Sequence, residues 1–397
     1  MAPRTILYTG KGGVGKTSVA AATARRLAAG GRRTLVLSTD PAHSLAESLG
    51  EELGSDPRAT HRNLWAQQVD AQREMERHWS GVQAWLSQLL VERGVDRISA
   101  EELTVPPGMD ELFALLTLQD ACESQRWDAI VVDCAPTGET LRLLSFPDVA
   151  RWWIDKVFPL QRQIAAAAGP LARALLDIEL PGHAAFSDVH RLSQRLIAMN
   201  ALLRDYERCT VRLVMNPERM VINEAMRTFT YLNLYGYVTD AVVVNRVFPS
   251  EVGDYFASWR RVQEQHLALV RSAFEPVPVL CVPYFEREVV GAEMLDRLAG
   301  ALFDGDSRDA GAILHAGLTQ QLELDATRAR LRLALPLARK CDISVKKIGL
   351  ELVVRVDGRK RTIALPSALA SYRPLAATFA DGELEITFDG ADAASRN

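Results

Sequence analysis

Cysteine is scarce in this 397-residue sequence, and no two cysteines stand in a metal-binding spacing. There are five, an odd number, and no CxxC pair occurs among them. This pattern excludes a disulfide framework and a cysteine-rich zinc site, so we expect no zinc, and it favours a reducing compartment. The cysteines are Cys122, Cys134, Cys209, Cys281 and Cys341.

Long apolar runs and an excess of basic charge are also missing. No uninterrupted apolar stretch reaches the roughly 18–20 residues that span a bilayer. The opening MAPRTILYTG runs directly into a strand pattern, so we expect no secretion signal and a cytoplasmic protein. A formal net charge of −4 gives no general attraction to nucleic acid or an anionic membrane. We therefore expect no nucleic-acid partner.

The sequence up to residue 306 alternates short apolar runs with longer helical stretches, which predicts an α/β domain with a mostly parallel sheet. The runs are rich in Val, Ile and Leu, as strands buried on both faces should be. Two long stretches, about 64–120 and 147–205, predict a helical subdomain on one face of the sheet. The strand candidates are Thr5–Tyr8, Thr34–Leu37, Ala129–Asp133, Val211–Met215, Ala241–Asn245 and Pro278–Val282.

The pattern changes after residue 306, where apolar and polar residues begin to alternate. Such alternation is typical of half-buried antiparallel strands. The pairs Asp357-Gly358 and Asp381-Gly382 favour tight hairpin turns. We predict a linker over 307–321, a small all-β domain over 322–389 and a polar tail over 390–397.

The strongest chemical signal is the glycine-rich run at residues 10–18, placed between a strand and a helix. Its glycines let backbone N–H groups curl around a phosphate, and the following helix N-terminus favours negative charge. Lys16 then reaches the β- and γ-phosphates, and the Thr17 hydroxyl is a ligand for Mg²⁺. This P-loop predicts a Mg-dependent ATPase. The run consists of Gly10, Lys11, Gly12, Gly13, Val14, Gly15, Lys16, Thr17 and Ser18.

Lys11 is a second lysine that the phosphate cradle does not need. In P-loop proteins of this variant type, the position reaches across a dimer interface and adds positive charge at the partner's nucleotide. The alternative is a solvated surface lysine. We predict the first role, which makes Lys11 a catalytic residue beside Lys16.

Two carboxylates follow the second and third predicted strands, where a P-loop protein keeps its nucleotide-sensing segments. Asp40 can orient and polarise the attacking water, although Asp-Pro is also a good helix start and Asp40 can be an N-cap instead. Asp133 ends a buried strand and is predicted to hold Mg²⁺ directly or through water. The segment after it, through Thr137, has the Pro and Gly residues of a loop that can rearrange.

Five segments of the sequence are GKGGVGKTS, STDPAHS, DCAPTGETLRLLSFP, VVVNRVFP and PYFEREVVG. Together they resemble the ATPase family that includes the arsenite-pump subunit ArsA and the factor for guided entry of tail-anchored membrane proteins. The resemblance implies a homodimer that closes around two ATP molecules, with Lys11, Lys16, Thr17, Asp40 and Asp133 in the roles above. It also places Asn245 beside adenine, although an Asn ending a strand often only satisfies a turn. A loop over 283–291, with Pro283 and Phe285, would close over the purine.

The sequence departs from that family at several points. Glu139 stands where members commonly have histidine, the zinc-clamping CxxC of the eukaryotic targeting factor is absent, and no cysteine lies around Glu102 to Asp110, where the pump has its metalloid ligands. Only one nucleotidase unit is present, whereas ArsA has two. The C-terminal β region resembles an α-crystallin or small heat-shock domain.

These features favour an ATP-driven carrier that binds and delivers apolar polypeptide segments, similar to the tail-anchored targeting factor. Its expected partners are a second copy, transmembrane-helix clients and a membrane receptor. The apolar stretch Arg151 to Asp205, including Leu196 and Met199, can form a client groove or an ordinary core. The alternatives are the energising ATPase of an arsenite pump and a partition-type ATPase; the latter lacks its usual basic surface here.

Overall fold

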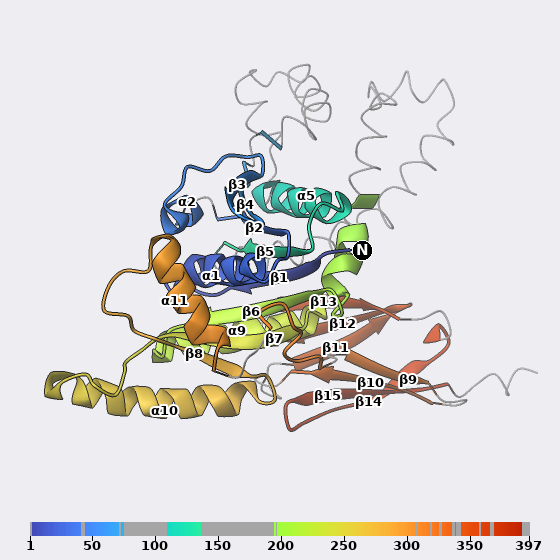
Figure 1. Ribbon diagram of the computed structural model, residues 1–397. Coiled ribbons are helices and arrows are strands. Elements are labelled where there is room, and N and C mark those ends of the chain that lie inside the picture. The colour runs from blue at the N-terminus through green and yellow to red at the C-terminus, as the bar shows by residue number, and fades with distance from the viewer. Residues whose placement is uncertain are drawn as a thin grey trace, which may run out of the picture.

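The chain forms an α/β body followed by an all-β C-terminal region (Figure 1). The predicted fold class, a mostly parallel sheet with helices and then a small β region, is thereby confirmed. None of the described helices is long and apolar enough to cross a bilayer. The computed structural model describes residues 2–40, 44–70, 73–74, 109–135, 194–195, 197–305, 309–317, 320–324, 328–335, 338, 343–356, 359–365 and 369–390.

The body is built on an eight-stranded sheet with the order β3-β4-β2-β5-β1-β6-β7-β8. All neighbours pair in parallel except β3 and β4. Six strands are those that the sequence predicts; in the five inner ones the Val, Ile and Leu side chains are buried on both faces, whereas the edge strand β8 is buried on alternate residues. They are β1 (Arg4–Thr9), β2 (Thr34–Ser38), β5 (Ala129–Asp133), β6 (Cys209–Met215), β7 (Thr239–Val247) and β8 (Val279–Pro283).

The predicted helical stretch 64–120 is wrong at its start, where the chain forms strand β4 (Leu64–Gln68). This strand pairs in parallel with β2 and follows β3 (Arg58–His61) through a tight turn in which Asn63 has φ 59°. The two glutamines of this strand favour a helix prediction, yet both side chains are buried. The Gln67 amide donates to the Ser55 carbonyl over 2.7 Å, which satisfies its polarity inside the sheet.

Helices pack on the sheet and begin or end at the loops that form the nucleotide site. Helix α1 packs against α11, and an ion pair of 2.7 Å between Arg25 and Asp296 joins them. Helix α9 contacts β6 and β7, and α10 lies at the periphery of the molecule (Figure 1). The helices are α1 (Lys16–Ala29), α2 (Ser44–Leu49), α5 (Met109–Glu123), α9 (Arg219–Tyr235), η1 (Asp254–Phe256), α10 (Ala257–Phe274) and α11 (Gly291–Phe303).

The C-terminal region consists of two antiparallel sheets, β14-β15-β10-β9 and β11-β12-β13. Burial alternates along β10 and β15, so each strand turns one apolar face inward, as the sequence predicts. The predicted turn at Asp381-Gly382 is confirmed, since both residues have positive φ; Asp357-Gly358 lies outside the described residues. The strands are β9 (Gln320–Leu324), β10 (Arg328–Ala334), β11 (Ile343–Ile348), β12 (Glu351–Val356), β13 (Arg359–Ala364), β14 (Arg373–Ala380) and β15 (Glu383–Asp389).

A buried ion pair attaches residues 310–312, through which the chain leaves the α/β body, to the sheet. The guanidinium of Arg212 contacts Asp240 at 3.0 Å, and both side chains are fully buried. Arg212 also donates to the carbonyls of Ala310 and Ala312, at 3.0 and 3.1 Å. Asp240 in turn accepts from Arg4 at 3.1 Å. Residues 310–312 are therefore bound to the core of the sheet.

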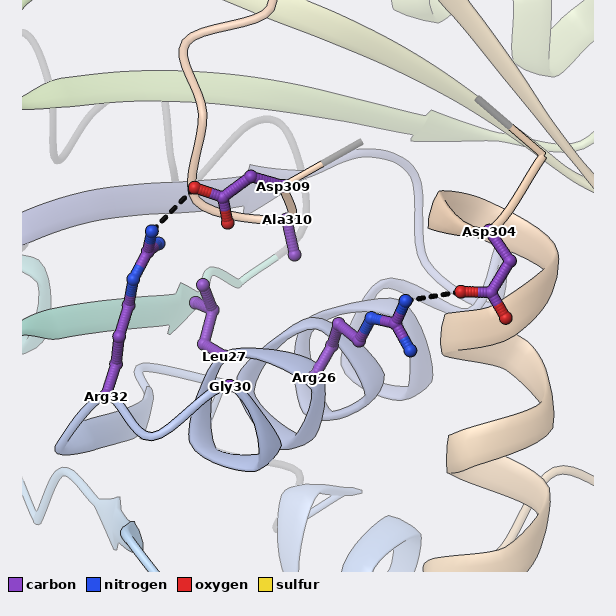
Figure 2. Close-up of a pocket in the computed structure, with 7 residues that line it drawn as sticks. All are labelled: Arg26, Leu27, Gly30, Arg32, Asp304, Asp309 and Ala310. Carbon is purple, nitrogen blue, oxygen red and sulfur yellow. Dashed lines mark hydrogen bonds and ion pairs between the residues drawn. The ribbon is translucent and has the colours of Figure 1, made fainter. Parts of the chain in front are cut away.

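Two further ion pairs lie near the C-terminal end of α1, and one of them reaches Asp309, next to the bound segment (Figure 2). Arg32 contacts Asp309 at 2.6 Å, and Arg26 pairs with Asp304 just beyond α11. Between them lies a cavity of about 350 Å³. Because these pairs are largely exposed, the buried Arg212–Asp240 pair contributes more to holding the segment.

We expect Asp240→Ala to lower the free energy of unfolding of the body by about 3–5 kcal/mol, because Arg212 and Arg4 are then left without their shared carboxylate in the core. Urea denaturation followed by circular dichroism measures this. The control is Asp128→Ala, which breaks the exposed pair with Arg33 and should leave stability nearly unchanged. Similar stability of the two variants would contradict the anchoring role of Asp240.

Candidate nucleotide site

The glycine-rich loop is held tightly between β1 and its neighbours. A Cβ at Gly10 would lie 2.1 Å from the Val214 carbonyl of β6, and one at Gly15 would lie 2.4 Å from the Asn245 amide. Gly15 also has φ 90°, a conformation that other residues rarely adopt. These positions need glycine because the loop must pass close to backbone and side chain, which fixes its curvature for a phosphate.

Lys16 is the first residue of α1, and its ammonium group lies inside the loop. Lys16 is buried and donates to the carbonyl of Lys11 over 3.4 Å. Gly15 precedes the helix and provides no side-chain cap, so the first N–H groups of α1 have no side-chain acceptor from that position. A bound phosphate fits both the open helix N-terminus and the buried positive charge.

Asp133 is the most unusual side chain of the site. It is fully buried at the end of β5, and its Oδ1 has no hydrogen-bond partner among the residues that the structure describes. Ser38 donates to Oδ2 over 3.3 Å. Burial raises the pKa of Asp133 to about 7, whereas the Thr17 hydroxyl and the charge of Lys16 oppose the rise. A buried carboxylate oxygen without a partner is costly unless a cation or water satisfies it.

The neighbouring oxygens fit a magnesium ion. The Thr17 hydroxyl lies 3.0 Å from that of Ser44 and is close enough to Asp133 to lower the pKa of its carboxyl. Hydroxyl and carboxylate oxygens are the ligands that Mg²⁺ prefers beside phosphates. When bound, Mg²⁺ neutralises charge on the β- and γ-phosphate oxygens. Thr17 and Asp133 are the residues that would hold it.

Asp40 lies beside this carboxylate. Its backbone N–H donates to Ser38 over 3.3 Å, its carbonyl accepts from Gln68 over 3.5 Å, and its charge acts on Asp133. The described part of α2 begins at Ser44, and residues 41–43 lie outside the described residues, so the N-cap alternative for Asp40 stays open. The charge of Asp40 therefore acts close to the predicted metal position, and water activation by Asp40 stays a prediction.

Lys11 points away from the phosphate cradle of its own chain. Its ammonium lies 3.8 Å from the Glu224 carboxylate on α9, and 38% of its side chain is exposed. This placement fits either a surface lysine or one that acts on a second copy.

Asn245 is hydrogen-bonded to the glycine-rich loop. Its amide nitrogen donates to the Val14 carbonyl over 2.9 Å, and its oxygen accepts from the Arg246 N–H over 2.9 Å. Arg246 has φ 59°, so the second contact satisfies a tight turn. Both polar atoms thus have partners within the chain, and adenine recognition by Asn245 stays a prediction.

The predicted purine loop begins where β8 ends at Pro283. The next N–H, of Tyr284, donates to the Val247 carbonyl over 2.8 Å, which joins this loop to the one after β7. Phe285 is half-buried and lies 5.4 Å from the Arg297 guanidinium, so its ring packs toward α11. Contact between Phe285 and a purine stays a prediction.

Sequence reasoning missed the two serine hydroxyls at the metal position. Ser38 contacts Asp133, and Ser44 contacts Thr17. Both lie in the segment that also contains Asp40, so the signal was present, but small hydroxyl residues are too common in loops to be singled out. His43, Thr137 and Glu139 lie outside the described residues.

Family comparison identifies the body. The family model described as "Anion-transporting ATPase" matches residues 3–304. The chain belongs to this family. A second model, described as "HSP20-like domain found in ArsA", matches residues 326–388 and confirms the resemblance of the C-terminal region to small heat-shock domains. As a member of the anion-transporting ATPases, the protein hydrolyses ATP, and membership implies the use of Mg²⁺.

Curated relatives bear both names that the resemblance suggested. A Chlorobaculum tepidum protein named "Putative arsenical pump-driving ATPase" is 38% identical over 393 residues, which cover 97% of this chain and 96% of the relative. A similarly named protein of Aquifex aeolicus is 35% identical over 394 residues, covering 96% and 99%. The "ATPase get3" of Aspergillus terreus is 28% identical over 310 residues, covering 75% and 90%.

The predicted client groove is described only in part. Met199 is fully buried and belongs to the main hydrophobic core, so at this position the core interpretation holds. Ile197 is 39% exposed. Leu196 and the stretch from residue 136 to 193 lie outside the described residues.

We expect Lys16→Ala to weaken ATP binding about 10–100-fold, because a buried charge-assisted contact with phosphate is lost. Asp40→Asn should bind ATP with nearly unchanged affinity but turn over about 10²–10⁴-fold more slowly, because only the water-orienting carboxylate is removed. Titration with a fluorescent ATP analogue and a phosphate-release assay separate the two effects. Equal losses of affinity in both variants would contradict the role of Asp40.

Proposed function

We propose that this ATPase is a homodimeric switch that binds and delivers apolar polypeptide segments. The observation that carries the proposal is the HSP20-like region joined to the ATPase body, and in particular its edge strand β14. This strand is exposed along almost its whole length, and Leu375 on it is 60% exposed. An open, partly apolar edge can pair with an extended segment of another chain through its backbone.

The nucleotide site would drive this cycle. The loop of residues 10–17 and the α1 N-terminus hold the phosphates, and Thr17 with Asp133 holds Mg²⁺. Asp40 orients the water that attacks the γ-phosphate. Lys11 of each copy adds positive charge at the nucleotide of the other.

Mixed dimers test the homodimer and the role of Lys11 together. Lys11→Ala and Lys16→Ala should each abolish most turnover as pure proteins. After subunit exchange, a mixed dimer has one site that lacks both lysines and one intact site. Equal mixing should therefore restore roughly a quarter of wild-type ATPase activity, since half of the dimers are mixed and each has one working site. No recovery, with exchange verified by labelled subunits, would show that Lys11 acts within its own chain.

An arsenical pump-driving ATPase is the second candidate, and the names of the relatives at 38% and 35% identity favour it. The chemistry of arsenite binding disfavours this candidate. Arsenite binds thiolates, and the region from Glu102 to Asp110 contains no cysteine. Three of the described cysteines, Cys122, Cys134 and Cys209, are buried, whereas Cys281 is only half-buried. Burial raises the pKa of all four thiols, which lowers their reactivity.

One experiment separates the two candidates. The Asp40→Asn protein with Mg-ATP is mixed with an apolar helical peptide, and wild-type ATPase activity is measured with arsenite. We expect peptide binding and no arsenite stimulation. Leu375→Asp should weaken peptide binding by about 10-fold or more, because a charge is placed on the apolar edge. The control Lys346→Asp changes a charge on β11 and should bind normally. Stimulation by arsenite without peptide binding would overturn the carrier proposal.

A further inference from the structure

Two neighbouring hydroxyl side chains, those of Ser38 and Thr39, lie where β2 ends. Ser38 is fully buried and is the last residue of this strand, and it pairs with Asp133, the last residue of the parallel strand β5. Asp40 follows the end of β2 directly, just as residues 134 and 135 follow the end of β5. The two hydroxyls are therefore placed between the candidate water-orienting residue and the candidate metal ligand.

The Ser38 hydroxyl contacts both carboxylate-bearing residues at once. It donates to Oδ2 of Asp133 over 3.3 Å and accepts from the backbone N–H of Asp40 over 3.3 Å. A hydroxyl has a single proton, so donating it to Asp133 leaves the lone pairs for the N–H of Asp40. The second contact alone is a common local turn, but the first joins residues 95 positions apart in the sequence. One hydroxyl thus holds the backbone of Asp40 in a fixed place relative to Asp133.

Thr39 joins the same two segments through three hydrogen bonds. Its backbone N–H donates to the carbonyl of Asp133 over 2.9 Å. Its hydroxyl accepts from the N–H of Ala135 over 3.3 Å and donates to the Asp133 carbonyl over 3.5 Å. The side chain here takes the place of the backbone partner that a longer strand would supply. The connection between the two chain segments is thereby extended past the strand ends, as far as Ala135.

These bonds make residues 38–40 and 133–135 one unit, which is also attached to the glycine-rich loop. The N–H of Cys134 donates to the Tyr8 carbonyl over 3.0 Å, and Tyr8 belongs to β1, the strand that leads into that loop. An attacking water reacts efficiently only when its orienting carboxylate is fixed relative to the phosphate, and a displacement of about 1 Å can cost about 100-fold in rate. Loss of a bond within this unit is therefore expected to act on turnover.

We infer that Ser38 and Thr39 are positioning residues for ATP hydrolysis, whose hydroxyls hold the segment of Asp40 in place against that of Asp133. The inference rests on the proposed role of Asp40 in orienting water. It requires no contact between either hydroxyl and the nucleotide, so the two groups act on the rate of hydrolysis rather than on ATP affinity. The competing explanation is that both hydroxyls only satisfy buried polar groups of the fold.

Thr39 offers a matched pair of substitutions. Thr39→Val removes the hydroxyl and keeps the shape of the side chain, whereas Thr39→Ser keeps the hydroxyl and loses a methyl group. We expect Thr39→Val to lower kcat about 10–100-fold and Thr39→Ser to stay within about 3-fold of wild type. Affinity for a fluorescent ATP analogue with Mg²⁺ should change less than about 3-fold in both. The control is Thr34→Val, which removes a buried hydroxyl at the opposite end of β2 and should keep the wild-type kcat.

Ser38 is tested by combining Ser38→Ala with Asp40→Asn in the full chain. If Ser38 acts by placing Asp40, Ser38→Ala should lower kcat about 10–100-fold in the wild-type background but less than about 3-fold in the Asp40→Asn background. Hydrogen exchange without nucleotide gives a readout besides activity. The amide of Asp40 should exchange about 10-fold faster in Ser38→Ala, because its acceptor is removed.

Three results would overturn the inference. Equal kcat values for Thr39→Val and Thr39→Ser would show that the Thr39 hydroxyl is not needed. Losses from Ser38→Ala and Asp40→Asn that multiply in the double variant would show that Ser38 acts independently of Asp40. Losses of ATP affinity or of melting temperature that account for the loss of kcat would make the hydroxyls binding or folding groups.

The proposed role of Asp40 is distinguished from the inference by the single variant. In each of the three cases that role stands, provided that Asp40→Asn alone binds ATP normally and turns over slowly. A wild-type rate in Asp40→Asn alone would instead remove the role of Asp40, and the inference would fall with it.

Discussion

The buried ion pair between Arg212 and Asp240 is the interaction on which the arrangement of the two regions depends. A charge in the core must be fully paired, and here Asp240 serves two arginines while Arg212 also binds Tyr8 at 3.1 Å. Tyr8 reaches Thr23 of α1 at 2.7 Å, so the network joins β1, β6, β7 and the first helix. Its remaining donors hold the backbone at residues 310 and 312. The HSP20-like region therefore leaves the body from a fixed point rather than from a free chain end.

The same cost of burying a charge applies to Asp133 at the nucleotide site, but there the charge is not fully paired. Asp133 is as deeply buried as Asp240, yet within the described part of the chain one of its oxygens has no partner. The surrounding hydroxyls of Ser38 and Thr17 satisfy only part of its need, and burial raises its pKa accordingly. An enclosed carboxylate of this kind favours a cation. The body thus combines one saturated charge network, which stabilises the fold, with one incomplete network, which binds a ligand.

Much of this was predictable from sequence because the signals are local. Val, Ile and Leu runs predicted six of the eight strands of the main sheet, and the glycine-rich loop indicated a nucleotide site with its lysine and threonine. Strand β4 was missed because Gln67 and Gln68 look solvent-exposed until their partners at Ser55 and Asp40 are known. Arg212 gave no signal either, since its partners lie 28 and about 100 residues away. Pairings at such separation are set by topology, which a local pattern does not contain.

The free-energy costs of breaking individual contacts indicate which contacts of the site can change when nucleotide binds. The Lys11–Glu224 pair is partly exposed and long, so separating it costs about 0–1 kcal/mol, and the lysine is readily transferred to another partner. Asn245 is different, because its amide is buried and both of its polar atoms are bonded. Freeing a buried amide without replacement costs about 1–3 kcal/mol. Lys11 is therefore the side chain that can respond to a second copy, whereas Asn245 keeps the loop in shape unless adenine replaces each bond that it gives up.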